Sequence, residues 1–127
     1  MTPQELLVKA DRALASAKLL LDSGDVDGAC NRAYYAMFDA ARAALLSIEA
    51  PVPAEVARTH SGLIAAFSLH LVKSGRIAIE HGRSLNKVED LRLIADYRGD
   101  PVSLENAAWA LDQASSFLAA VQALPKT

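Results

Sequence analysis

A chain of 127 residues is long enough for one domain of ordinary size and too short for two, so we expect a single domain over residues 1–127. Hydrophobic residues make up 52% of the chain and the formal net charge is -2, which excludes the strongly basic balance of a dedicated duplex-DNA binder. The single cysteine, Cys30, excludes an intrachain disulfide and favours a reducing, cytoplasmic location.

Two helices are expected in the first half of the chain. The first begins after Thr2, whose side chain can cap it, and ends at Gly24. The second begins at Asp25 or Asp27, and it ends before residues 50–53 because the two prolines there cannot continue a helix. In both segments apolar residues recur at helical spacing, with Cys30 as a small buried residue of the second stripe.

Three more helices are expected in the second half: from near Thr59 to residues 74–75, roughly from Ser84 to Arg98, and onward from a cap at Ser103. The segment 76–83 stays ambiguous, and a short separate turn is one option. No segment alternates with a period of two, so we assign no strands. The sequence therefore predicts an all-α fold, an antiparallel bundle of four or five helices.

Several kinds of site are excluded by what the chain lacks. A cysteine-type zinc site is impossible with one cysteine, and the three histidines never share a helix face. There is no glycine-rich phosphate loop and no signal-peptide pattern at the start. We therefore expect no metal, no cofactor and no membrane association.

Polar residues gather on one face of the second helix: Arg32, Tyr35, Asp39 and Arg42. One interpretation is a solvated face with an Asp39–Arg42 ion pair. The other is a polar groove in which two guanidinium groups and a tyrosine hydroxyl bind a phosphate. Both interpretations stay open at this point.

The fourth helix carries an arginine at an unusual place. Arg92 lies between Leu91 and Ile94 in an otherwise apolar register, and Asp96 follows one turn later. The pair can be an ion pair that stabilises the helix end. Alternatively, Arg92 faces a polar cleft at a dimer interface.

Three blocks of this chain resemble the HEPN family: Asn31-Arg32-Ala33-Tyr34-Tyr35 and the residues up to Leu46, Thr59-His60-Ser61-Gly62, and Leu91-Arg92 followed by Ala95-Asp96-Tyr97. They occur in the family's order, and the resemblance covers nearly the whole chain. It is strongest to the short, stand-alone branch, which is UPF0332-like. The resemblance implies a HEPN-like helical bundle.

The resemblance also implies an activity. Many HEPN proteins are metal-independent ribonucleases whose motif is an arginine followed, after four to six residues, by a histidine at a dimer interface. Arg92 matches the arginine, whereas Asp96 and Tyr97 occupy the place of the histidine. Carried over to this chain, the catalytic residues are Arg92, Asp96 and Tyr97, and the residues that contact RNA or phosphate are Arg32, Tyr35, His60 and Arg98.

Two functional hypotheses follow from the resemblance. In the first, the protein is the HEPN component of a toxin–antitoxin-type pair, acts in RNA cleavage or its control, and has a minimal nucleotidyltransferase partner that modifies Tyr97. In the second, it is a catalytically silent binding and dimerisation module that binds a nucleotide or the nucleotidyltransferase. Both include a homodimer, for which Trp109 is a candidate interface residue. An Arg-x-x-x-x-His string also occurs from Arg76 to His81, and we interpret it as a chance match.

Overall fold

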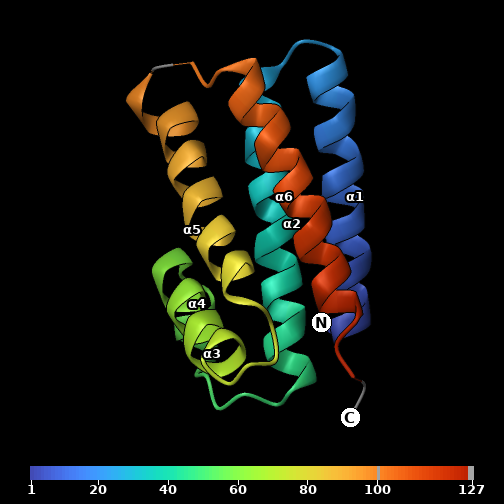
Figure 1. Cartoon of the computed structure of the whole chain (residues 1–127), viewed down its shortest axis with the longest axis vertical. Coiled ribbons are helices and arrows are strands. Elements are labelled where there is room, and N and C mark those ends of the chain that lie inside the picture. The colour runs from blue at the N-terminus through green and yellow to red at the C-terminus, as the bar shows by residue number, and fades with distance from the viewer. Residues whose placement is uncertain (100, 126–127) are drawn as a thin grey trace.

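The computed structural model describes residues 1–99 and 101–125, and in these residues the protein is all-α without strands. Four long helices run along the longest axis in alternating directions (Figure 1). They are α1 (Pro3–Asp22), α2 (Val26–Ser47), α5 (Ile79–Leu93) and α6 (Leu104–Gln122). Two shorter helices, α3 (Ala54–Ala57) and α4 (His60–Phe67), lie together at one end of the bundle. The predicted all-α bundle is confirmed.

Two π-helical turns extend helices α4 and α5. The turn η1 (Ser68–Val72) continues α4, and the turn η2 (Ile94–Arg98) continues α5. No helix in the described part of the chain is both long and apolar enough to cross a bilayer.

Side-chain caps begin the helices where the sequence predicts them. The Thr2 hydroxyl accepts a hydrogen bond from the Glu5 amide at 3.1 Å, and the Ser103 hydroxyl accepts one from the Asn106 amide at 3.0 Å. Asp25, rather than Asp27, caps α2. The predicted helix end after Arg98 is confirmed by Gly99, which follows η2 and whose φ of 75° lies in the left-handed region that favours glycine.

The segment 76–83 is resolved as mostly helical, because α5 begins at Ile79 instead of near Ser84. Ala78, at the N-cap, makes no side-chain capping bond, so no local signal marks this start. The segment between η1 and α5 is positioned by packing, since Ile77 is buried and its amide donates a hydrogen bond to the Leu71 carbonyl at 3.0 Å.

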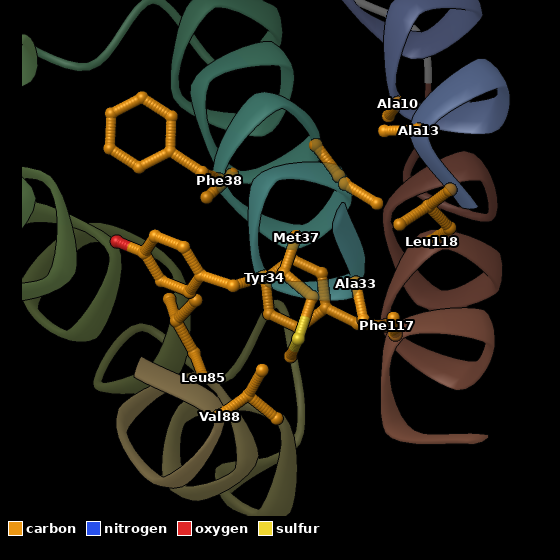
Figure 2. Packing of buried hydrophobic residues seen from close by; sticks show 14 of the residues in the cluster. Ala10, Ala13, Ala33, Tyr34, Met37, Phe38, Leu85, Val88, Phe117 and Leu118 are labelled. Atoms are coloured by element: carbon orange, nitrogen blue, oxygen red, sulfur yellow. The ribbon is translucent and has the colours of Figure 1, made fainter. Parts of the chain in front are cut away.

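The core is centred on α2, which packs against α1, α5 and α6 as well as α4. Alanines line the contact between α1 and α2 and allow their backbones to approach closely, as Ala10, Ala13 and Ala33 show (Figure 2). Larger side chains fill the space toward α5 and α6. The rings of Phe67 and Phe117 lie with centroids 5.0 Å apart, linking α4 to α6 across the core.

The predicted solvated face of α2 is wrong at Asp39. This carboxyl is only 4% exposed, because α1, which carries Lys9, packs along this side of α2. Among the described residues, no ion pair joins Asp39 to Arg42. Burial raises the pKa of Asp39, and the charges of Lys9, Arg42 and Arg32 offset this effect only in part.

Candidate functional site

The side chain of Arg92 lies in the last turn of α5 and is 3% exposed. Its guanidinium carbon lies 4.9 Å from the ring centroid of Tyr34, 5.9 Å from that of Tyr35 and 5.8 Å from that of Tyr97. These three tyrosines form what we call the tyrosine cage. A guanidinium at such distances from aromatic rings is attracted by their quadrupoles. Within the single chain, Arg92 is therefore covered by these rings, and the cleft at a dimer interface stays a prediction.

Two carboxylates balance the charge of Arg92. Glu89 Oε2 lies 3.6 Å from Nη2, and Asp96 Oδ2 lies 3.5 Å from Nη1, both longer than a good hydrogen bond. The Nε atom is buried without a hydrogen-bond partner among the described residues. Burial lowers the pKa of Arg92, but the neighbouring Tyr35, Glu89 and Tyr34 raise it, and the net direction is upward. The guanidinium is thus charged, while its donors remain incompletely used.

A histidine from another helix reaches the same carboxylate. His60, the first residue of α4, has its Nδ1 atom 3.8 Å from Glu89 Oε2 and 2.7 Å from the Tyr34 hydroxyl. Tyr34 is fully buried, and burial together with the Glu89 carboxylate raises its pKa strongly. The His60 side chain itself is 37% exposed. One buried carboxylate oxygen therefore lies within 4 Å of both His60 and Arg92.

Local contacts within residues Thr59–Gly62 place His60 at the beginning of α4. The Thr59 hydroxyl accepts a hydrogen bond from the Gly62 amide at 3.0 Å and donates one to the Val56 carbonyl at 3.0 Å. A side-chain carbon at Gly62 would collide with that carbonyl, so glycine is required for α3 to pack this closely on α4. These contacts together fix the beginning of α4, and with it His60, relative to α3.

The residues after Arg92 follow a π-helical turn rather than the predicted regular helix. Within η2, Asp96 Oδ2 accepts a hydrogen bond from Asn31 Nδ2 at 2.9 Å, which joins the turn to α2. Tyr97 is 75% exposed, although its ring lies beside the guanidinium. Such π-helical turns occur often at functional sites.

Most of the predicted site residues lie together. Arg92, Asp96, Tyr97 and His60 belong to one cluster with Tyr35, and Arg32 stacks on Tyr35 at 5.8 Å. Arg98 is exposed at the end of η2. The sequence did not predict Glu89, which lies between His60 of α4 and Arg92 of α5. Its only local signal was a position three residues before Arg92, where an acid can reach the arginine along the helix.

Two other candidates lie outside this cluster. Arg76 is exposed in the link before α5, whereas His81 packs edge-on against Phe117 with centroids 6.2 Å apart. No ion pair or hydrogen bond of the described residues joins Arg76 to His81, in keeping with a chance match. Cys30 is buried as expected, and burial raises the pKa of its thiol to about 11, which disfavours the nucleophilic thiolate.

The sequence model of the HEPN domain matches residues 3–124, nearly the whole chain. The chain belongs to the HEPN family. It is 37% identical over 122 residues to a UPF0332 protein of Gloeobacter violaceus, with 93% of each chain covered. A UPF0332 protein of Thermotoga maritima is 35% identical over 118 residues, covering 91% of this chain and 85% of that one.

A further relative carries a functional name. This protein of Methanocaldococcus jannaschii, named as a candidate toxin, is 34% identical to the HEPN protein over 115 residues, covering 91% of this chain and 82% of that one. The predicted family and its UPF0332-like branch are thereby confirmed.

Proposed function

We propose that this HEPN protein is the toxin-type member of a two-gene module and acts by metal-independent cleavage of RNA. The observation that carries the proposal is Arg92, a buried guanidinium with incompletely used donors. The Methanocaldococcus jannaschii relative named as a candidate toxin supports the toxin-type role. A delocalised, planar cation of this kind is well suited to the charge that develops on a phosphodiester under attack.

The reaction in this proposal is an internal transesterification. The ribose 2′-hydroxyl loses its proton to a base, and its oxygen bonds to the adjacent phosphorus. The bond from phosphorus to the 5′-oxygen breaks, and that oxygen takes up a proton as it leaves. Arg92 stabilises the additional negative charge on the phosphorane oxygens between these two steps.

Access to Arg92 requires a movement in this proposal. The guanidinium is 3% exposed, and the exposed ring of Tyr97 lies beside it. When the substrate phosphate binds, the Tyr97 ring swings outward and the phosphate takes its place near Nε and the two Nη atoms. Arg32, Tyr35 and Arg98 contact the neighbouring RNA backbone. Asp96 accepts from Asn31 and balances Arg92, so it positions η2 rather than accepting the proton.

The test is cleavage of a labelled single-stranded RNA by the purified protein in a buffer containing a metal chelator. We expect fragments that end in a 2′,3′-cyclic phosphate and begin with a 5′-hydroxyl. A matched strand with 2′-deoxyribose at the cleaved position should stay intact, because it lacks the attacking hydroxyl. If a broad panel of RNAs shows no cleavage, the proposal is wrong, and the silent module that binds a nucleotide or nucleotidyltransferase is favoured.

The proposal includes a homodimer in the cytoplasm and a minimal nucleotidyltransferase as partner. Within one chain, Trp109 is partly buried against the core, and the Lys87 ammonium lies 5.8 Å from its ring centroid. This ring is therefore only in part available to a second copy.

We expect that the partner nucleotidyltransferase transfers a nucleotide from ATP to the Tyr97 hydroxyl. The hydroxyl oxygen would attack the α-phosphorus, pyrophosphate would leave, and the added phosphodiester would place a negative charge beside Arg92. With 75% of its surface exposed, Tyr97 is accessible, whereas Tyr34 is fully buried. Intact-mass spectrometry after incubation with the partner and ATP should show the mass of one nucleotide added.

Two tyrosine variants separate the possible acceptors. Tyr97→Phe should abolish the mass gain, and Tyr35→Phe, from the same cage, should retain it. A gain that persists in Tyr97→Phe would show that another residue is modified.

A further inference from the structure

The Glu89 carboxylate lacks a donor that its burial requires. Its Oε2 atom is buried without a hydrogen-bond partner among the described residues, although Arg92 and His60 both lie within 4 Å. A buried carboxylate oxygen without a donor costs more free energy than most other unpaired groups. A proton directed at Glu89 from a neighbouring side chain would remove this cost.

The Tyr34 hydroxyl and His60 decide where that proton comes from. The hydroxyl lies 2.7 Å from His60 Nδ1, and one of the two groups must donate to the other. If His60 carries its proton on Nε2, Tyr34 donates to Nδ1, and the Nδ1 lone pair faces Glu89. If His60 carries its proton on Nδ1, it donates to the Tyr34 oxygen, and the Tyr34 proton is free for Glu89, the carboxylate whose interaction with this hydroxyl helps to raise the pKa of Tyr34. Only the second arrangement gives the carboxylate a donor, and a hydrogen bond to an ionised acceptor is the stronger kind.

We propose that Glu89, acting through Tyr34, holds His60 in the tautomer protonated on Nδ1, so that His60 Nε2 is the proton acceptor for the 2′-hydroxyl. This inference rests on the proposed RNA cleavage and identifies its base. The relay Glu89–Tyr34–His60 draws on α5, α2 and α4, and its buried end lies beside Arg92. His60 is a catalytic residue in this assignment, and Glu89 and Tyr34 are positioning residues.

The exposure of the three residues fits these roles. Tyr34 is fully buried and Glu89 is 16% exposed, whereas the His60 side chain is 37% exposed. Its Nε2 atom makes no hydrogen bond to the described residues, so this nitrogen keeps a lone pair for a substrate proton. In the reaction, Nε2 takes the 2′-hydroxyl proton, and the resulting imidazolium can return a proton to the departing 5′-oxygen. Glu89 stabilises this imidazolium while Arg92 stabilises the phosphorane.

The tautomer can be measured directly by nitrogen NMR of the full-length protein, labelled at its histidines and held at a pH where His60 is neutral. We expect His60 Nε2 to give the resonance of an unprotonated nitrogen and Nδ1 that of a protonated one. The signals are assigned by their loss in His60→Gln. His70 and His81 serve as internal controls. A protonated Nε2 in the unmodified protein overturns the inference.

The variant Glu89→Gln tests the cause. It keeps the shape of the side chain but removes the anionic acceptor, so His60 should shift toward the tautomer protonated on Nε2. Tyr34→Phe removes the hydroxyl between Glu89 and His60, so it should also shift His60 toward the tautomer protonated on Nε2. If either variant retains its thermal unfolding temperature and leaves the His60 signals unchanged, the relay is wrong.

Cleavage assays separate this inference from the proposed function. His60→Gln should lower the rate by roughly 10²–10⁴-fold, the range typical of a lost general base, and His70→Gln should leave it unchanged. The NMR result does not depend on whether RNA is cleaved. The expected tautomer in a protein that cleaves no RNA would overturn the proposed function alone. Full cleavage by His60→Gln would overturn the assignment of the base alone.

Discussion

Replacing Arg92 with alanine should lower the rate of RNA cleavage by at least about 100-fold, the usual cost of removing a group that stabilises transition-state charge. The guanidinium is the buried cation of the tyrosine cage, and its unpartnered Nε can bind a phosphate oxygen once the Tyr97 ring has moved outward. The measurement is the rate of cleavage at saturating enzyme, well below the unfolding temperature of the variant.

The same substitution should also destabilise the fold. Without Arg92, the carboxylates of Glu89 and Asp96 lose their positive partner while they remain 16% and 28% exposed. We expect a loss of about 1–3 kcal/mol in the free energy of unfolding, less than for a fully buried pair because solvent screens both acids. From the sequence alone, we would expect little loss of fold. Because Arg92 is buried, we expect a measurable loss of stability instead.

Two matched variants separate charge, shape and fold. Arg92→Lys keeps the charge but replaces the planar fork with a point charge, so it should retain more stability than alanine and still lose at least about tenfold in rate. Arg12→Ala, at an exposed position of α1, should change neither quantity. Full cleavage by folded Arg92→Ala would show that the arginine has only a structural role.

Phe117→Ala should lower the free energy of unfolding by about 3–5 kcal/mol, the largest stability effect we expect in this chain. The ring is fully buried and lies 5.0 Å from that of Phe67, with His81 edge-on at 6.2 Å. Its removal leaves a cavity between α4, α5 and α6 that long helices cannot close by small shifts. Urea denaturation should show a lower midpoint with an unchanged slope.

A leucine on the outer surface provides the comparison. Leu19 of α1 is 71% exposed, so Leu19→Ala should change the free energy of unfolding by no more than about 0.5 kcal/mol. Phe117→Leu keeps most of the buried volume and should fall between the two. If Phe117→Ala cost no more than Leu19→Ala, the contact between α4 and α6 would not contribute to stability.

The sequence by itself determined the helical class and most helix boundaries, because these depend on residues within one turn of each other. The hydroxyl of Thr2, the carboxylate of Asp25 and the left-handed backbone of Gly99 act on amides and carbonyls only a few positions away. Where such a signal is absent, as at Ala78 before α5, the predicted boundary was wrong by several residues.

Part of the site could also be predicted, and for a different reason. Arg92, Asp96 and Tyr97 lie on one stretch of chain, and the family resemblance identified that stretch before any geometry was known. His60 and Tyr35 were included because they lie in the other two matching blocks. Their mutual contacts did not enter the prediction.

Only the tertiary structure decided which groups meet and which are buried. The contact of His60 with Tyr34 spans 26 residues and that of Asn31 with Asp96 spans 65, and no helical periodicity encodes either distance. The packing of α1 along α2 buried Asp39, a residue whose own sequence neighbours predict a solvated face. Burial and long-range contact depend on the arrangement of whole helices, which is why Glu89 acquired its place between His60 and Arg92 only in the folded chain.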